Sequence, residues 1–425
     1  MEQPKQPFDA KKWKNCLFAG ALLLLFFIGL LFFFRPTRSE SEKRELTPFP
    51  RLTFSSLISG EFFDGVSTWY ADTYPGREAL VSGSLALREL TGVHDEKIII
   101  HDDPAPTPSG DGDDPADDTP IEKLGGVYLK GKTAYELYRE SREESEAYAA
   151  LVAKAAEQLK GKATVYDIIV PLSSNVNLSE SEQSSIGCSD AKAAIDRMYG
   201  AMTNVKTVDI LDLLKSHKSE YLYFRTDHHW TAKGAYYAYT AFCEVAGITP
   251  KDLSEWRYCQ FDGFLGTLYN EAGKPSVLKD NPDTVEAWVP QGTNDIYLTD
   301  KSGARQRYRN GVVRTDTDSF YSAAGSKYNC FIMGDNPLSE IHNEALHDGS
   351  AIVVVKESFG NALVPFLVDH YEYVYVVDYR YFTNSTGKTL STFVAEKGAK
   401  TVLFINNLTA TSSPSRIGEL EKLLK

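Results

Sequence analysis

Short, mostly apolar runs recur through the C-terminal part of the chain, and they constrain its fold more than any other feature. They lie at Ala163–Pro171, Val205–Ile210, Tyr328–Gly334, Ala351–Lys356, Tyr373–Asp378 and Thr401–Asn406. Several are apolar throughout, as in strands that a parallel sheet buries on both faces. A long amphipathic helix is expected before them, over Thr133–Leu159. The alternation predicts an α/β fold, a three-layer α/β/α domain with a mostly parallel sheet.

A longer apolar run near the start, Cys16–Phe34, carries no charge and is about as long as a helix that crosses a bilayer. It ends in phenylalanines followed by Arg35 and Pro36, where a cleaved signal would have small residues, so we expect an uncleaved signal anchor. Basic residues flank it almost equally on both sides, and no other long apolar run follows. We therefore expect one transmembrane helix over 16–34, a cytoplasmic tail over 1–15 and the rest of the chain outside the cytoplasm. A buried core helix is the alternative.

The remaining chain divides by composition. Residues 35–100 are expected to form a charged spacer and a helical segment that packs on the main domain. Residues 101–120 are rich in Asp, Pro and Gly, which predicts a disordered acidic linker. The main domain is then expected over 121–425, with a less regular insertion around 253–326.

Charge and cysteine content exclude some classes of function. The formal net charge of −13 would repel a nucleic-acid backbone, so no nucleic-acid partner is expected. Outside the apolar run the chain has four cysteines, Cys188, Cys243, Cys259 and Cys330, and their spacing is not that of a zinc site. One or two disulfides stay open, and no cofactor is expected.

The stretch "RTDHHWT" is the first candidate site. Thr231 is expected to cap a helix that runs to Gly247, so the histidines precede that helix. In an extended segment side chains alternate, which would put Asp227 and His229 on one side and His228 and Trp230 on the other. Asp227 could then orient His229, which would act as general base toward a hydroxyl nucleophile.

Ser358 is the best candidate for that nucleophile. It follows the apolar strand Ala351–Lys356 and precedes a helix-like segment that begins near Asn361. A serine on a strand-to-helix turn is exposed at the carboxyl end of the sheet, where backbone N–H groups can bind an oxyanion. The alternatives are that Ser358 is a helix cap, and that His228 and His229 join Asp227 in a metal site. The stretch Gly334–Glu344 is polar, and we expect a turn and a helix start there.

Four segments together, "RTDHHWT", "VVKESFGNALVPFL", "WYADTYPGREALV" and "VVDYRYF", resemble the DHHW protein family, bacterial membrane-anchored proteins similar to the SGNH-hydrolase-like domains of alginate O-acetyltransferases. The resemblance covers about Phe49 to Asn407. It implies an SGNH-hydrolase-like fold, with Ser358 as nucleophile, His229 as base and Asp227 as orienting residue. The relatives more often have Asp where this chain has Glu357, a change that should not disturb the triad.

For further residues the resemblance implies less specific roles. Gly360 and Asn361 would form the oxyanion site, and Arg225 and Trp230 would shape the pocket. Tyr379 and Arg380 would approach it from the next strand. Core packing is the alternative for Trp230, and pairing with a surface acid is the alternative for Arg380.

The function that the resemblance implies is O-acetyl transfer to, or removal from, a cell-surface polysaccharide at the bacterial cell membrane. A polytopic membrane acyltransferase that supplies acetyl groups would be the partner. Two other classes remain open: a non-catalytic glycan-binding scaffold for cell-envelope assembly, and a metal-dependent hydrolase. Labelling of Ser358 by a serine-directed probe separates the first from an enzyme, and loss of activity with a chelator would favour the second.

Overall fold

The computed structural model describes residues 20, 27, 35–39, 44–46, 48–50, 52, 61–76, 97–98, 119–316 and 324–425. The chain forms two compact units, Met1–His94 and Asp95–Lys425, which are described one at a time. Apart from Gly20 and Phe27, the predicted membrane span lies outside the described residues, as does the predicted linker apart from Thr119 and Pro120. Within the described part of the chain no helix is both long and apolar enough to cross a membrane.

The first unit contains one short antiparallel pair, β1 (Arg38–Ser39) with β2 (Arg44–Glu45), and the helix α3 (Glu61–Asp72). Trp69 of α3 is buried, and its ring meets that of Phe49 edge-on with centroids 4.7 Å apart. The guanidinium of Arg35 lies 3.7 Å from the centre of the Trp69 ring. Aromatic contacts therefore fix this helix to the residues before it.

The second unit is built on an eight-stranded sheet with the order β12-β11-β13-β15-β14-β16-β7-β8. Its strands are β7 (Thr164–Val170), β8 (Val205–Thr207), β11 (Ile296–Thr299), β12 (Arg305–Tyr308), β13 (Leu338–His342), β14 (Ala351–Lys356), β15 (Tyr373–Asp378) and β16 (Thr401–Asn407). From β15 to β8 all neighbours pair in parallel, whereas β13, β11 and β12 pair antiparallel. The predicted α/β class is confirmed, and the sheet is mixed.

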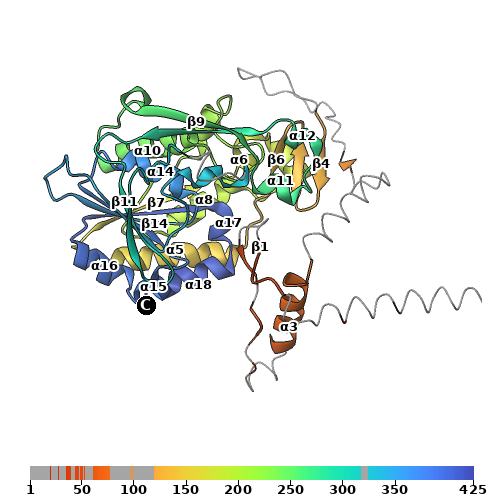
Figure 1. The fold of residues 1–425 in the computed structure, drawn as a ribbon, viewed down its shortest axis with the longest axis horizontal. Coiled ribbons are helices and arrows are strands. Elements are labelled where there is room, and N and C mark those ends of the chain that lie inside the picture. The colour runs from red at the N-terminus through yellow and green to blue at the C-terminus, as the bar shows by residue number, and fades with distance from the viewer. Residues whose placement is uncertain are drawn as a thin grey trace, which may run out of the picture. The chain divides into compact units, whose positions relative to one another are not determined.

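Helices cover both faces of this sheet (Figure 1). On one face α5 (Arg142–Gln158) contacts α16 (Leu390–Lys397) and α18 (Pro414–Leu423). On the other face α10 (Ala232–Ala246) packs against α14 (Gly360–Leu367), all of whose residues are buried. The apolar character of β14, β15 and β16 follows from this double cover.

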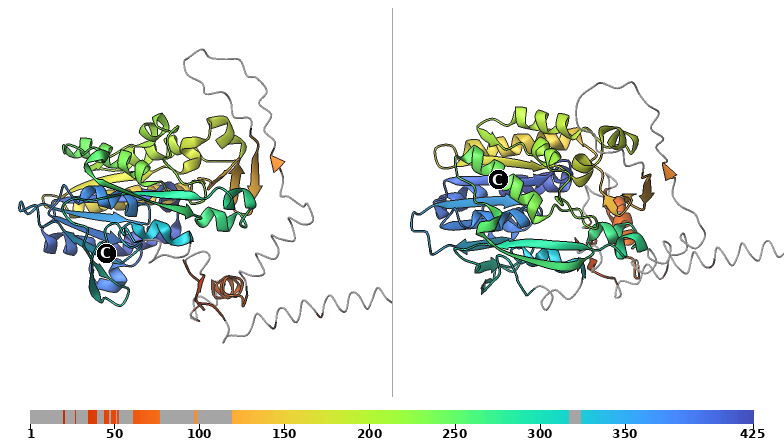
Figure 2. Two further views of the ribbon diagram at one scale, coloured as in Figure 1. Left: turned by 45° about the horizontal axis from the view of Figure 1, so that its top comes forward. Right: turned by 90° about the horizontal axis from the view of Figure 1, so that it is seen from above.

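Two smaller sheets complete the unit. One joins β3 (Lys97–Ile98), β4 (Ile121–Leu124), β5 (Val127–Lys130) and β6 (Thr133–Tyr135), and the other is the long antiparallel pair β9 (Arg257–Phe264) and β10 (Asp283–Val289), which Figure 2 shows as a separate ribbon beside the large sheet. The remaining α-helices of this unit, among the described residues, are α6 (Ser173–Asn177), α7 (Glu180–Ser185), α8 (Ala191–Ala201), α9 (Leu211–Ser216), α11 (Thr267–Glu271), α12 (Ser276–Lys279), α15 (Phe382–Thr386) and α17 (Leu408–Thr411). In the described part of this unit, 3-10 helices span Leu253–Glu255 and Ala324–Cys330.

Three sequence predictions about elements are wrong or need correction. The helix predicted from Thr133 begins at Arg142, because Thr133–Tyr135 pairs with β5 instead. The apolar run Tyr328–Gly334 is not a strand but the end of a 3-10 helix followed by left-handed backbone. The polar stretch Gly334–Glu344 contains β13, not a helix start.

The region around 253–326 is more regular than its sequence predicts. It holds the β9–β10 pair, and β11 and β12 extend the large sheet as its antiparallel edge. The residues of β12, "RQRY", are exposed or half-buried, because an edge strand keeps one side in water. Because these residues are polar, the hydrophobic pattern of the sequence does not predict a strand there.

Candidate active site

The "RTDHHWT" segment forms a tight bend between two paired positions. Tyr223 and Trp230 form an antiparallel bridge, and the Phe224 N–H donates to the His229 carbonyl over 3.2 Å. The Thr231 hydroxyl accepts from the Gly234 N–H and caps α10, which ends at Gly247 as the sequence predicts. The bend thus presents its polar side chains just before the helix.

Asp283, a fully buried residue at the start of β10, holds this bend in place. Its carboxylate accepts from the Thr226 N–H at 2.7 Å and the Thr226 hydroxyl at 2.6 Å. Arg225 donates to it through Nε at 3.1 Å and to the Pro282 carbonyl at 2.9 Å. In this structure Arg225 therefore serves to fix the bend, and its predicted pocket role stays a prediction.

Two side chains of this bend and one from a distant part of the chain meet in one hydrogen-bonded row. Asp227 Oδ1 lies 2.6 Å from His229 Nδ1, and His229 Nε2 lies 2.8 Å from Ser358 Oγ. These are the contacts expected of an orienting acid, a base and a nucleophile. The structure brings the three predicted residues together, and their catalytic roles stay a prediction.

Asp227 is enclosed by more than the histidine. Its Oδ2 accepts from the Thr267 N–H at 2.9 Å and from the Thr267 hydroxyl at 3.2 Å. Burial alone would raise the pKa of Asp227, but the charges of His229 and His228 and these hydrogen bonds hold it well below its ordinary value. The carboxylate is therefore ionised at neutral pH, as an orienting acid must be.

Ser358 lies on the turn between β14 and α14, half-exposed, as the sequence predicts. Trp230 is fully buried and donates through Nε1 to the Phe359 carbonyl at 2.9 Å. This bond ties the residue after the serine to the bend that carries the histidine. Trp230 thus combines core packing with a role in fixing the site.

Tyr328 is a site residue that sequence reasoning missed. Its ring stacks on that of His229, with centroids 4.0 Å apart and planes 13° apart, and its hydroxyl donates to the Ser358 carbonyl at 3.0 Å. The sequence predicts an apolar strand at this residue, because aromatic and apolar neighbours surround it. Only the tertiary structure reveals that it touches both the His229 ring and the backbone of Ser358.

The groups predicted for the oxyanion site already have partners. The Gly360 N–H donates to the Glu357 carbonyl at 3.1 Å, and the Asn361 amide donates to Asp335 at 3.0 Å. The Asn361 Oδ1 atom is buried without a hydrogen-bond partner among the described residues. The oxyanion role of these two residues stays a prediction.

Tyr379 and Arg380 take part in buried polar networks. The Tyr379 hydroxyl donates to Asn406 at 2.8 Å. Arg380 donates to Asp378 at 2.7 Å and pairs with Asp335 at 2.8 Å, so its partners include a fully buried acid in place of the surface acid considered above. Both residues lie at the carboxyl end of β15, and their approach to the substrate stays a prediction.

Alternation of side chains predicts that His228 points away from His229, and this prediction is wrong. Because the segment bends, the two rings lie 3.9 Å apart, and ligand atoms of Asp227, His228 and His229 lie within 4.8 Å of one another. Hydrogen bonds engage these atoms, since His228 Nδ1 lies 2.5 Å from the Thr267 hydroxyl. The pKa of His228 is lowered by burial and, after it, by the charge of His229. The arrangement fits a hydrogen-bonded relay better than a metal centre.

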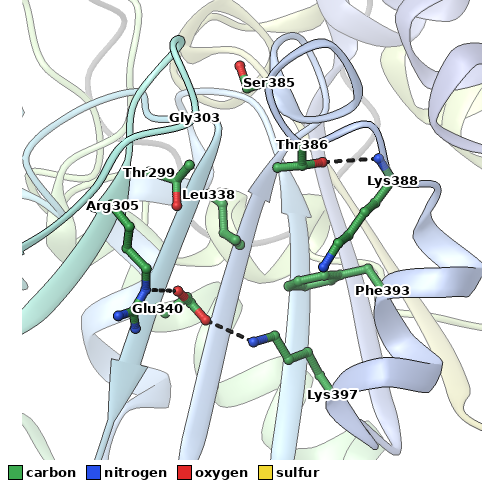
Figure 3. Close-up of a pocket in the computed structure, with 10 residues that line it drawn as sticks. All are labelled: Thr299, Gly303, Arg305, Leu338, Glu340, Ser385, Thr386, Lys388, Phe393 and Lys397. Atoms are coloured by element: carbon green, nitrogen blue, oxygen red, sulfur yellow. Dashed lines mark hydrogen bonds and ion pairs between the residues drawn. The ribbon is translucent and has the colours of Figure 1, made fainter.

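A separate open pocket of about 490 Å³ lies against β11, β12, β13 and α16 (Figure 3). Glu340 accepts from Arg305 at 2.5 Å and from Lys397 at 3.0 Å, so two of the pocket's cations share this one carboxylate. Its lining includes none of Asp227, His229 and Ser358. The pocket is therefore distinct from the candidate active site.

Comparisons with known proteins agree with the resemblance seen in the sequence. The family model described as "DHHW protein" matches residues 42–111 and 108–377. A crystal structure of a DHHW family protein from Eubacterium siraeum is similar, with 27% identity, a TM-score of 0.61, and coverage of 72% of this chain and 98% of that chain.

More distant similarity extends to Bacillus cereus PatB1, whose structure was solved with a sulfonyl adduct. Identity is 16%, the TM-score is 0.56, and 68% of this chain and 98% of that chain are covered, which indicates a shared fold. The O-acetyltransferase domain of Pseudomonas putida AlgJ also matches, with 12% identity, a TM-score of 0.37 and coverage of 71% and 98%. No curated protein matches the chain.

Proposed function

The chain belongs to the DHHW protein family, and from that premise we propose that it is an acyl-serine enzyme, an O-acetyltransferase or acetylesterase that acts on a cell-surface polysaccharide. The observation that carries this proposal is the 2.8 Å contact between His229 Nε2 and Ser358 Oγ, with Asp227 on the other ring nitrogen. A hydroxyl at this distance from an oriented imidazole can be deprotonated as it attacks a carbonyl.

The chemistry runs in two half-reactions. Ser358 Oγ bonds to the carbonyl carbon of an acetyl ester while its proton passes to His229 Nε2. The bond to the leaving alcohol then breaks, and that alcohol takes the proton from His229. In the second half a hydroxyl of the acceptor gives its proton to His229 and attacks the acetyl carbon. The bond from that carbon to Ser358 Oγ then breaks, and Oγ takes the proton from His229. With a sugar as acceptor the enzyme is a transferase, and with water it is an esterase.

We also propose the cellular setting. Residues 16–34 would anchor the chain in the bacterial cell membrane as a single span, with the main domain outside the cytoplasm. A polytopic membrane acyltransferase would then supply acetyl groups across the bilayer. A protease added to intact spheroplasts should digest the main domain, and its protection there would contradict this orientation.

The test uses the full chain purified in detergent and a chromogenic acetyl ester. Wild type should release the chromophore and acquire an acetyl group on Ser358, whereas Ser358→Ala and His229→Ala should lose both activities by about a hundredfold or more. Thermal unfolding of the variants controls for their folding. A folded wild type that neither turns over the ester nor becomes acetylated would favour the glycan-binding scaffold.

The cluster of Asp227, His228 and His229 supports one other candidate, a metal-dependent hydrolase. Activity that disappears with a chelator and returns with a divalent ion would identify it. The acyl-serine mechanism predicts turnover that a chelator leaves unchanged.

A further inference from the structure

The carboxylate of Glu357 lies beside the proposed nucleophile. Ser358 Oγ is 2.8 Å from His229 Nε2 and 3.1 Å from Glu357 Oε2. A hydroxyl has one hydrogen, so it can donate to only one of these two acceptors at a time. An ionised Glu357 therefore competes with His229 for the hydrogen on which the proposed mechanism depends.

The position of this carboxylate is fixed from both sides. Oε2 accepts from the Phe359 N–H at 3.1 Å, and Oε1 accepts from the Asn407 N–H at 3.2 Å. The residue is 4% exposed, so water does not screen its charge from the serine. The side chain bridges the nucleophile turn and the end of β16, and it cannot swing away without breaking a backbone contact.

The protonation of Glu357 is set by what surrounds it. Burial raises its pKa above the ordinary value, the guanidinium of Arg380 opposes that shift, and the carboxylate of Asp335 adds to it. The two backbone N–H groups favour the ionised form. Tyr379, Tyr328 and His228 also interact with its charge.

We propose that Glu357 is a further catalytic residue, which in its protonated form donates to Ser358 Oγ and leaves the serine hydrogen to His229, and in its ionised form draws that hydrogen away. This inference rests on the proposed acyl-serine function. In addition to its structural contacts, Glu357 would change the rate at which Ser358 reacts, according to whether its carboxyl group is protonated.

The protonated form favours both half-reactions. During attack the serine proton passes to His229 Nε2, while the Glu357 proton stays on its carboxyl group and keeps its hydrogen bond to Oγ. When the acyl-serine breaks down, Oγ leaves with developing negative charge, and the same hydrogen bond stabilises it. An ionised Glu357 would instead place a negative charge about 3 Å from the departing oxygen, which opposes the step.

The experiment measures how fast phenylmethylsulfonyl fluoride modifies Ser358, by intact mass, at a series of pH values from about 5 to 9. The full-length wild type should react fastest at an intermediate pH, because His229 must be neutral and Glu357 protonated. Its rate should then fall about tenfold toward alkaline pH, roughly the effect of one hydrogen bond to a charged group.

Glu357→Gln is the central variant, because its side chain has nearly the same shape and cannot ionise. It should reach a plateau and show no alkaline fall. The amide forfeits one of the two backbone bonds, so its absolute rate at acid pH should lie below that of wild type, and the shape of the profile is the readout. Glu357→Asp keeps the charge one methylene farther from Oγ and should show a smaller alkaline fall than wild type.

The matched control is Glu340→Gln, which changes an acid paired with Arg305 and Lys397 outside the site. Its profile should equal that of wild type. An alkaline fall that persists in Glu357→Gln would overturn the inference, as would a folded Glu357→Gln that is as inert as His229→Ala. A wild type that reacts at no pH would overturn the proposed function and this inference with it.

Discussion

At the residue scale, the position of Asp227 depends on Gly266, which packs against it and has no side chain. A Cβ placed on Gly266 would lie 2.2 Å from the Asp227 Cβ and 2.3 Å from its Oδ2. Real carbon atoms do not approach so closely, so only glycine lets the Thr267 N–H reach the carboxylate. Gly266 is therefore part of what orients His229 through Asp227.

We predict that Gly266→Ala displaces Asp227. The overpacking should cost about 1 to 3 kcal/mol of unfolding free energy, and acetyl-ester hydrolysis should fall by about tenfold or more because His229 loses its orientation. Gly418→Ala in α18 is the control, since its Cβ would meet nothing within 4 Å. Urea unfolding and steady-state kinetics measure both effects, and an unchanged hydrolysis rate in a folded Gly266→Ala would contradict the prediction.

At the element scale, two charged side chains join the carboxyl ends of neighbouring parallel strands. Lys356, at the end of β14, pairs in register with Asp378, at the end of β15. Its ammonium lies 2.9 Å from Asp378 and 2.9 Å from Asp335, and the residue has no exposed surface. Lys356 stands two residues before Ser358, so this buried network fixes the strand end that leads to Ser358.

We predict that Lys356→Met destabilises the protein strongly. Removing one partner from a buried ion pair leaves a poorly compensated carboxylate, which costs about 3 to 5 kcal/mol. Lys397→Met is the control, because its ion pair with Glu340 is partly exposed and should be worth about 1 kcal/mol or less. Urea unfolding of both variants gives the comparison, and equal losses would refute the distinction.

The elements that the sequence predicts well are those whose burial is uniform. β14 and β15 have the predicted bounds because every residue of these strands but Tyr373 is buried, so the apolar run is continuous. β13 was missed because exposed or half-buried Glu340 and His342 alternate with its buried residues after Pro337. Tyr328–Gly334 was misread because a short apolar run indicates burial but does not distinguish a strand from a turn.

Some residues of the candidate site can likewise be predicted from the sequence, and others cannot. Asp227, His229 and Ser358 could be predicted, because local chemistry and position in the chain mark them. Tyr328 and Thr267 could not, because they reach the site from segments whose sequence carries no catalytic pattern. Their roles follow from the packing of distant segments, which spacing along one chain does not specify.

At the scale of the whole molecule, buried carboxyl groups make the stability of the fold depend on pH in two opposite directions. Asp167 has no exposed surface, and its Oδ2 has no hydrogen-bond partner among the described residues. Burial raises the pKa of Asp167 to about 7. The pKa values of Asp227 and Asp335 are instead lowered, since histidine, arginine and lysine charges outweigh their burial.

These shifts predict where the unfolding free energy is lost. As the pH rises from about 4 to 7, unfolded chains release the Asp167 proton while folded chains keep it, so stability should fall by about 2 to 4 kcal/mol. Below about pH 4, protonation of Asp227 and Asp335 should remove the stability that their ionised forms contribute. The combined contribution of these three groups is therefore largest near about pH 4.

The measurement is urea unfolding across this pH range for wild type, Asp167→Asn and the exposed control Asp196→Asn. Asp167→Asn should show a smaller decline between about pH 4 and 7, because its amide does not ionise and only other buried carboxyl groups with a raised pKa, such as Glu357, still contribute. The control should keep the full decline. A decline that is the same in all three proteins would show that another group is responsible.

The place of β14 in the sheet also sets when activity can first arise during synthesis. The strand that leads to Ser358 lies between β15 and β16, both of which follow it in the chain. During synthesis His229 leaves the ribosome 129 residues before Ser358. When Ser358 itself emerges, β14 still lacks both of its neighbours, β15 and β16. Asn407, which holds Glu357, arrives with the last strand. The nascent protein should therefore stay inert toward esters until its final strand is in place.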